Sequence, residues 1–184
     1  MKSIKEILFF DADGTLWYPK KTKYNEKPWW IYSHPKIKAN QLRHFALIPH
    51  VKRALKKLNE KGLTLVLISQ VPYTKKVAFQ KLRRKTKHFG IYEFFAEIRP
   101  SYQPAHKDHP DPKTIAILEV LKKRKIPKSK ALMIGDSYTH DYLAAKSCGI
   151  DCLLICAFKH TEDDKQYRRV RNKIKNLNEV LKYV

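Results

Sequence analysis

Three polar stretches in the sequence each follow an apolar run and carry side chains that can bind a metal ion or contact phosphate. They are Asp11 and Asp13 after 4–10, Ser69 and Gln70 after 63–68, and Asp136 and Asp141 after 131–134. Carboxylates that converge repel one another unless a cation lies between them. Oxygen ligands of this kind favour Mg²⁺, which also binds substrate phosphate. The residues therefore predict a metal-assisted phosphate site.

Such a site supports phosphoryl transfer through a covalent intermediate. An aspartate beside Mg²⁺ is a competent nucleophile, and an aspartyl-phosphate divides one difficult displacement into two easier steps. A second carboxylate can protonate the leaving oxygen and later deprotonate water. Lys113, at the start of an expected helix, supplies a positive charge to the same region.

The elements that must position these residues alternate between strands and helices. Apolar runs at 4–10, 63–68, 95–98, 131–134 and 152–156 predict strands, and helical spacing predicts helices at 49–61, near 77–87, at 114–123, around 143–148 and over 170–181. In the helix at 114–123 we expect Ile115, Leu118 and Leu121 on one side. This alternation predicts a doubly wound, Rossmann-like α/β fold with a parallel sheet and helices on both faces. Ligands of such sheets bind beyond the carboxyl ends of the strands.

Length and composition favour one domain over residues 1–184. The chain has 184 residues, of which 43% are hydrophobic, enough for one packed core. Residues 17–48 have little periodicity and are too long for an ordinary loop, so we expect an insertion that acts as a short cap or flap. The sequence shows neither a long apolar run nor a signal peptide, so we expect a cytoplasmic protein without membrane contact.

The charge balance predicts an anionic partner. The chain has 39 Lys and Arg against 17 Asp and Glu, a formal net charge of +22. Such a field attracts nucleic acid, phosphorylated substrates or acidic surfaces without choosing among them. Basic runs at 83–85, 122–125 and 168–171 lie on or beside amphipathic helices, where solvated helix faces also explain them.

The cysteines predict core packing rather than a metal site. Cys148, Cys152 and Cys156 lie in one apolar stretch without CxxC spacing or paired histidines. We therefore expect reduced thiols in a cytosolic protein.

The motifs together resemble the haloacid dehalogenase superfamily. The resemblance rests on Asp11-Ala12-Asp13-Gly14-Thr15-Leu16, Ser69, and Gly135-Asp136-Ser137 with Asp141, each after an apolar run. Trp17 and the position of Lys113 are most similar to the magnesium-dependent phosphatase branch. Dehalogenases of this superfamily lack the carboxylate at Asp13, so phosphate chemistry is favoured.

The resemblance implies a role for each position. Asp11 would be the nucleophile, and Asp13 the general acid and base whose backbone carbonyl also meets the metal. Asp136 would be a metal ligand, and Asp141 would support the metal shell. Ser69, with Gln70, would bind the substrate, and Lys113 would neutralise Asp11 and the phosphate.

One departure leaves the lysine open. Many relatives place it directly before Pro-Asp-Pro, where this sequence has His109. Lys113 is our first assignment, Lys107 the substitute and His109 a third candidate, whereas His106 is expected to be a loop residue. The insertion is too short for a full cap domain, and its Trp29, Trp30 and Tyr32 would either form a flap or pack the insertion down.

Two functions follow as hypotheses. The first is a Mg²⁺-dependent phosphatase of phosphomonoesters acting through phospho-Asp11 on a sugar phosphate, phosphoprotein or nucleotide. The alternative is a nucleic-acid-binding protein or polynucleotide-end phosphatase that uses the basic surface. Locally, the DxDGT stretch could be a surface turn, Ser69 a helix cap, and Asp141 an ordinary helix N-terminal charge.

Overall fold

The computed structural model of the chain describes residues 4–22, 31–32, 34, 36–71, 73–101, 111–155 and 165–184. Six residues named in the sequence analysis lie outside these ranges: Trp29, Trp30, His106, Lys107, His109 and Cys156. Within the ranges, no helix combines the length and apolar character that crossing a bilayer requires.

Six parallel strands form the central sheet in the order β5-β4-β1-β6-β7-β8. Their bounds are β1 Ile7–Phe10, β4 Thr64–Gln70, β5 Glu97–Ser101, β6 Ala131–Gly135, β7 Asp151–Ile155 and β8 Lys173–Ile174. From β1 the chain first adds β4 and β5 on one side and then crosses to β6 on the other. The strand order therefore reverses between β1 and β6, where ligands of such sheets bind. The predicted doubly wound α/β fold is confirmed.

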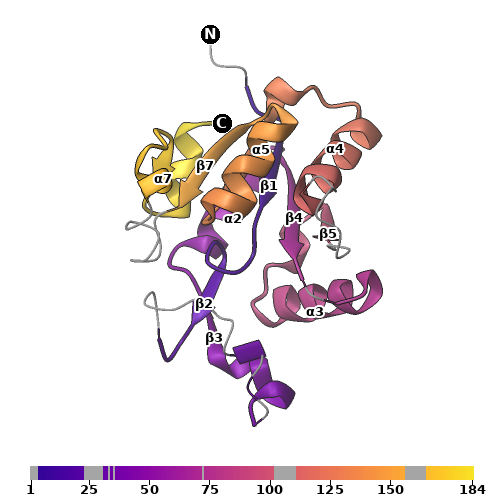
Figure 1. Cartoon of the computed structure of the whole chain (residues 1–184), viewed down its shortest axis with the longest axis vertical. Coiled ribbons are helices and arrows are strands. Elements are labelled where there is room, and N and C mark those ends of the chain that lie inside the picture. Colours follow the sequence, from indigo (N-terminus) through magenta and orange to yellow (C-terminus); the bar gives the residue numbers. More distant parts are fainter. Residues whose placement is uncertain are drawn as a thin grey trace.

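Helices cover both faces of the sheet (Figure 1). The helices are α2 Val51–Glu60, α3 Lys75–His88, α4 Pro112–Arg124, α5 Leu143–Cys148 and α7 Lys165–Arg168, with short 3-10 or π turns at η2 Tyr92–Phe94, η3 Lys128–Lys130 and η4 Tyr138–Tyr142. Leu8 and Phe10 of β1 pack in one core with α2, whereas Ile7 and Phe9 pack in the other with α4 and α5. Because both faces are covered, β1 is apolar at every position.

The segment after β1 forms a small antiparallel sheet, separate from the six-stranded sheet, whose Trp17 and Phe45 belong to the same core as Leu8 and Phe10. It consists of β2 (Trp17–Pro19) and β3 (Phe45–Leu47), and the 3-10 segment η1 (Lys38–His44) precedes β3. Trp17 is fully buried and stacks on Phe89, with ring centroids 5.8 Å apart. Figure 1 shows this sheet and α3 at the same end of the molecule, toward which β1 and β4 point. The insertion predicted over 17–48 thus begins and ends with paired strands beside the carboxyl ends of the main sheet.

The helix predicted over 170–181 is wrong. The chain instead forms β8 and the 3-10 segment η5 (Leu177–Lys182). Val170, Ile174 and Leu177 are buried, as the apolar pattern requires, but Leu154 N donates to Asn172 O at 3.1 Å and joins this segment to the sheet. Edge pairing with β7 outweighs helix formation because a short apolar pattern fits either structure.

The side chosen for the helix at 114–123 is also wrong in part. Ile115 and Leu118 are 41% and 37% exposed, although Leu121 is buried, and the core face carries Ile117 and Val120 instead. This helix is apolar on several sides, so its periodicity does not select one face. As predicted, Cys148 and Cys152 are buried free thiols in the core.

Candidate active site

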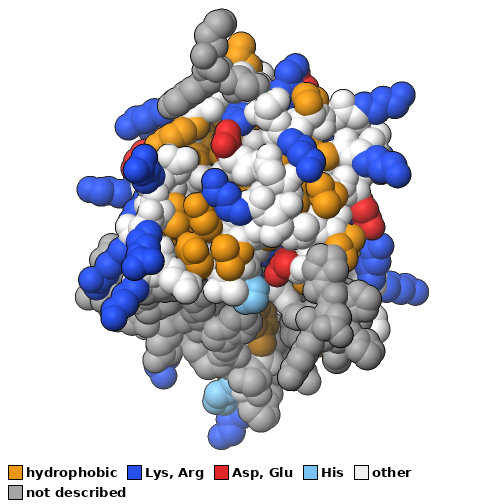
Figure 2. Space-filling model, turned by 45° about the horizontal axis from the view of Figure 1, so that its top comes forward, with side chains coloured by type: hydrophobic (Ala, Val, Ile, Leu, Met, Phe, Trp, Pro, Cys, Tyr) orange, Lys and Arg blue, Asp and Glu red, His pale blue; other side chains and the backbone are white. Residues whose placement is uncertain are grey.

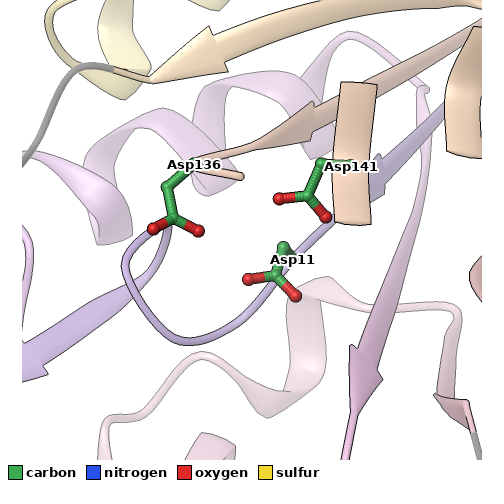
Figure 3. Close-up of side chains that lie close together, drawn as sticks. All are labelled: Asp11, Asp136 and Asp141. Atoms are coloured by element: carbon green, nitrogen blue, oxygen red, sulfur yellow. The ribbon is translucent and has the colours of Figure 1, made fainter. Parts of the chain in front are cut away.

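Three carboxylates converge at the point where the strand order reverses. Asp11 directly follows β1, and its backbone N donates to Ile134 O of β6 at 2.9 Å. Asp136 directly follows β6, and Asp141 lies in η4. One ligand oxygen from each of the three carboxylates lies within 4.8 Å of the others, and all three residues are buried (Figure 3). The structure therefore brings together three of the four predicted metal-site residues.

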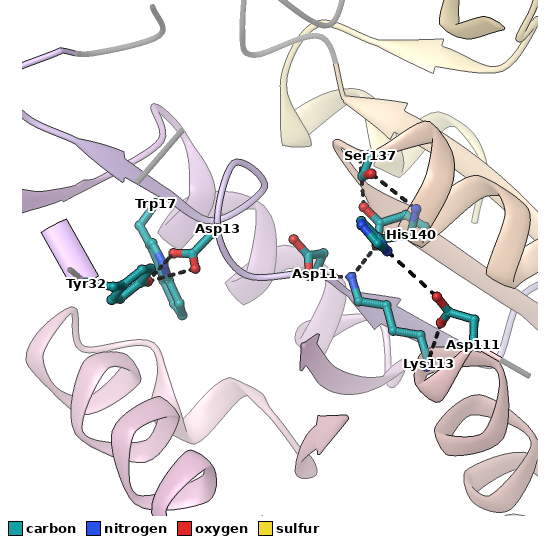
Figure 4. Close-up of polar contacts among 9 residues, drawn as sticks. Asp11, Asp13, Trp17, Tyr32, Asp111, Lys113, Ser137 and His140 are labelled. Atoms are coloured by element: carbon teal, nitrogen blue, oxygen red, sulfur yellow. Dashed lines mark hydrogen bonds and ion pairs between the residues drawn. The ribbon is translucent and has the colours of Figure 1, made fainter. Parts of the chain in front are cut away.

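Lys113 reaches this cluster from the first turn of α4. Its Nζ lies 2.6 Å from Asp11 Oδ1 and also donates to Asp141 Oδ1 (Figure 4). The N-cap residue Asp111 accepts a hydrogen bond from Lys113 N at 2.8 Å, and Pro112 occupies the first helical position, where its missing N–H costs nothing. The cap and the proline set the helix start, and with it the direction of the Lys113 side chain. The alternatives Lys107 and His109 lie outside the described residues.

Burial and charge set the protonation of this pair. Burial, with the nearby charges of Asp141 and Asp136, raises the pKa of Asp11 to about 8 despite the opposing effect of Lys113. Burial alone would lower the pKa of Lys113, but the charges of Asp11 and Asp141 together raise it above its ordinary value. Lys113 therefore stays protonated, and one ammonium group faces three carboxylates.

Asp141 is fixed by the turn that carries it. The turn η4 is a single π-helical turn, a local form that often occurs at functional sites. Ser137 N donates to Asp141 Oδ2 at 2.9 Å, and Ser137 Oγ accepts from His140 N at 3.2 Å. Asp141 is fully buried, so it is not an ordinary surface charge at a helix start.

The side chain of Asp13 points away from the other carboxylates. It accepts hydrogen bonds from Trp17 Nε1 and from Tyr32 Oη, the latter at 2.8 and 2.7 Å to its two oxygens (Figure 4). Lys85 Nζ lies 3.5 Å from Asp13 Oδ1 and donates to Tyr32 Oη at 2.6 Å. Among the described carboxylates, Asp13 is thus outside the group of three that could share an ion through their side chains.

The positive φ of Gly14 shapes the turn that gives the two aspartates different directions. Gly14 has φ 87°, which favours glycine, and its N donates to Trp17 O at 2.9 Å. The turn returns the chain at once, so that Trp17 donates to Asp13 from only four residues away. The DxDGT stretch is therefore a turn that places two carboxylates at the end of one strand.

Lys85 is the residue that sequence reasoning missed. Its Nζ lies 3.9 Å from the ring centroid of Phe45 and 4.8 Å from those of Trp17 and Tyr32. Burial lowers the pKa of Lys85, against the opposing effect of Asp13. Burial, reinforced by the charge of Asp13, raises the pKa of Tyr32, which keeps its hydroxyl group protonated as a donor.

A helical pattern in the sequence could have revealed Lys85. Ala78, Leu82 and Lys85 recur at the spacing of one helix face, and all three are buried. A solvated helix face explains the exposed residues Arg83 and Arg84 of this basic run, but it does not explain Lys85, which is buried.

Ser69 and Gln70 are the last two residues of β4. Both line a cavity that Asp13 also lines, and Ser69 is buried. They therefore lie beside the Asp13 end of the site rather than in the carboxylate cluster.

The donor set fits a magnesium ion. The cluster offers only carboxylate oxygens, which Mg²⁺ prefers, and three buried carboxylates exceed the charge of Lys113. Asp11, Asp136 and Asp141 are the residues that would hold the ion.

Comparison with known families agrees with this geometry. The family model for haloacid dehalogenase-like hydrolases matches residues 15–155. The chain belongs to this family. The match confirms the resemblance to haloacid dehalogenase-like hydrolases inferred from the motifs. The matched range begins after Asp11 and covers β4, β6, Asp136 and Asp141.

Curated relatives of this haloacid dehalogenase-like hydrolase match over part of their length. A phosphoglycolate phosphatase of Vibrio vulnificus is 34% identical over 104 residues, which are 56% of this chain and 41% of the relative. A protein of Caldanaerobacter subterraneus named as a PpaX pyrophosphatase is 29% identical over 59% of this chain and 44% of its own length. The chain thus matches less than half the length of these relatives.

Solved structures share the fold along the whole chain. A haloacid dehalogenase-like hydrolase from Streptococcus pneumoniae has a TM-score of 0.70 at 19% identity and covers 100% of this chain and 99% of its own. A phosphatase of the same superfamily from Thermococcus onnurineus has a TM-score of 0.69 at 17% identity, with 97% of each chain covered. At these identities the matches establish the fold alone.

Proposed function

We propose that the protein is a Mg²⁺-dependent phosphatase that hydrolyses phosphomonoesters through an aspartyl-phosphate on Asp11. The observation that carries the proposal is the position of Asp11, which contacts Lys113 and lies beside two further carboxylates at the ligand-binding edge of the sheet. A bound Mg²⁺ would neutralise charge on the carboxylates and on the transferred phosphoryl group.

The protein's own side chains supply the remaining chemistry. The Asp11 carboxylate attacks phosphorus, the bond to the leaving oxygen breaks, and that oxygen takes a proton from Asp13. Asp13 then accepts a proton from water, which attacks phosphorus and releases phosphate and free Asp11. Lys113 stays protonated beside Asp11, and the Ser69 hydroxyl group donates to the phosphoryl oxygens.

The insertion over 17–48 would act as a flap over Asp13. Its Trp17 and Tyr32 both donate to Asp13, so this segment orients the proposed acid and base. Gln70 would bind substrate beside Ser69, since both line the cavity next to Asp13.

The face of the molecule that Figure 2 shows gives nucleic-acid binding no specific support. On this face, Lys and Arg side chains are spread apart and separated by uncharged and apolar atoms. A nucleic-acid surface requires basic groups gathered along one track.

The first test measures hydrolysis of p-nitrophenyl phosphate with Mg²⁺ and with EDTA. We expect activity only with Mg²⁺, a fall of at least about 1,000-fold in Asp11→Asn, and a phosphoryl group on Asp11 by mass spectrometry after acid quenching. Asp151→Asn is the matched control, because Asp151 is an exposed carboxylate that pairs with Lys5 away from the site. Full activity in EDTA or in Asp11→Asn would refute the mechanism.

A further inference from the structure

A cavity of about 360 Å³ lies beside Asp13, within the size range of small-molecule sites. We call it the α3 pocket. Residues 40–43 of η1 form one wall and α3 forms another, and Ser69 and Gln70 at the end of β4 also line it. Asp13, the proposed proton donor, lines the pocket, whereas Asp11 does not.

The described residues of the pocket carry an excess of positive charge. Asp13 is their one carboxylate, whereas the basic side chains are Arg43, Lys81, Arg84, Lys85 and His88. Lys85 is already bound to Tyr32 and Asp13, and Lys81 lies over the ring of Tyr73 at 4.4 Å.

Two of these cations are available to a ligand. Arg43 of η1 and Arg84 of α3 line the pocket from two different elements, and both side chains are exposed. Within the described parts of the chain, neither forms an ion pair with a carboxylate. Guanidinium groups bind carboxylate and phosphate through two parallel hydrogen bonds.

We propose that the α3 pocket binds the leaving group, and that the preferred substrate is a compact phosphomonoester whose leaving group carries a second anionic group. This inference rests on the phosphatase activity proposed above. Asp13 protonates the leaving oxygen, so the leaving group must extend from Asp13 into this pocket. An anion placed between Arg43 and Arg84 is attracted from both walls, and the small volume favours a metabolite-sized molecule over a polymer.

The test compares substrates that differ in one anionic group. One pair is 3-phosphoglycerate and glycerol 3-phosphate, which tests a carboxylate, and the other is glucose 1,6-bisphosphate and glucose 6-phosphate, which tests a second phosphate. We expect kcat/KM to be at least about 10-fold higher for the anionic member of one pair or both. The pair that responds identifies the anion.

Variants then connect this preference to the pocket. Arg84→Gln and Arg43→Gln should each lower the ratio of kcat/KM within the responding pair by about 5-fold or more. Arg83→Gln is the matched control, because Arg83 is the exposed neighbour on the same helix, lies over the ring of Tyr92 and does not line the pocket. It makes the same change in net charge and should leave the ratio unaltered.

The outcomes separate this inference from the proposed function. The inference alone is overturned, and the proposed function stands, if p-nitrophenyl phosphate is hydrolysed in an Asp11-dependent way but neither substrate pair shows a preference. The same holds if the ratio of kcat/KM within the pair is equal in Arg84→Gln and the native protein. Faster hydrolysis of 3′-phosphorylated oligonucleotides than of all four small substrates also overturns it. If no substrate is hydrolysed, the proposed function fails. Calorimetric titration of the native protein and of Arg84→Gln with 3-phosphoglycerate and with glucose 1,6-bisphosphate then still tests the pocket. If neither ligand binds, the inference is overturned.

Discussion

The carboxylate of Asp141 occupies the space in which a side chain at Gly135 would lie. A Cβ atom placed at position 135 overlaps the carboxyl carbon and one oxygen of Asp141. Gly135 ends β6, and Asp141 is fully buried beside Lys113. The glycine of the Gly-Asp-Ser stretch is thus required for the close approach of a carboxylate rather than for a positive φ.

Replacing Gly135 with alanine should therefore damage the metal site first. The new methyl group must displace Asp141, so we expect Mg²⁺ affinity to fall at least about 10-fold and the free energy of unfolding to fall by about 1–3 kcal/mol. Calorimetric titration with Mg²⁺ and chemical denaturation measure the two effects.

Gly62→Ala is the control for the glycine substitution. Gly62 has φ +77°, and a methyl group there would meet no atom within 4 Å, so alanine is strained without touching the site. It should cost roughly 1–2 kcal/mol of stability and leave Mg²⁺ affinity unaltered. Equal Mg²⁺ affinities in both variants would show that the absence of a side chain at Gly135 is not needed to place the Asp141 carboxylate.

The strand ends could be predicted because buried parallel strands have a strong sequence signature. Asp11 and Asp136 each follow an apolar run directly, and such a run ends where the sheet's carboxyl edge begins. The place of Lys113 at a helix start could also be predicted from the sequence, since Pro112 and the cap at Asp111 mark that start.

Contacts made across the insertion could not be predicted. Tyr32 meets Asp13 and Lys85 only after β2 and β3 have paired, and no local spacing encodes that meeting. Lys85 shows the same limit, because a lysine within a basic run gives no sign of the aromatic rings that bury it. The helix predicted over 170–181 failed for a related reason, namely that pairing with β7 is a long-range effect.

Lys113→Met should destabilise the protein in EDTA much more than in Mg²⁺. The substitution removes the ammonium group that contacts Asp11 and Asp141 and leaves these buried carboxyl groups without a cation, at a cost of about 3–5 kcal/mol. Mg²⁺ should restore part of this loss, because its charge replaces the missing cation. Thermal unfolding in both buffers measures the difference. In Lys130→Met, which breaks an ion pair with Glu6 on the surface, both buffers should give nearly native stability.

The stability of the metal-free protein should fall as pH rises from about 4 to about 8. The pKa of Asp11 is raised from 3.8 to about 8, so in this window the folded state holds a proton that the unfolded state releases. Stability then decreases with pH, because the folded state binds more protons. Mg²⁺ requires ionised carboxylates, so its stabilising effect should grow over the same window.

Unfolding midpoints measured across this pH range in EDTA and in Mg²⁺ test the effect. Asp11→Asn cannot ionise at this position and should show a flatter pH dependence in EDTA than the native protein. Parallel pH profiles for the two proteins would contradict the assignment.

The contact between Tyr32 and Asp13 offers a test that depends on the leaving group. The Tyr32 hydroxyl group donates to both oxygens of Asp13 and accepts from Lys85, which fixes the direction of the proposed proton donor. Proton donation matters most when the leaving oxygen is strongly basic, as in an alkyl phosphate, and least for p-nitrophenyl phosphate.

Tyr32→Phe should accordingly lower kcat about 10-fold for glycerol 3-phosphate and much less for p-nitrophenyl phosphate. Steady-state kinetics with both substrates gives the two ratios. Tyr92→Phe makes the same chemical change at a half-buried residue that does not line the α3 pocket, and should alter neither ratio. An equal loss for both substrates in Tyr32→Phe would mean that Tyr32 supports the fold or substrate binding and does not position Asp13, because only a defect in proton donation distinguishes the two leaving groups.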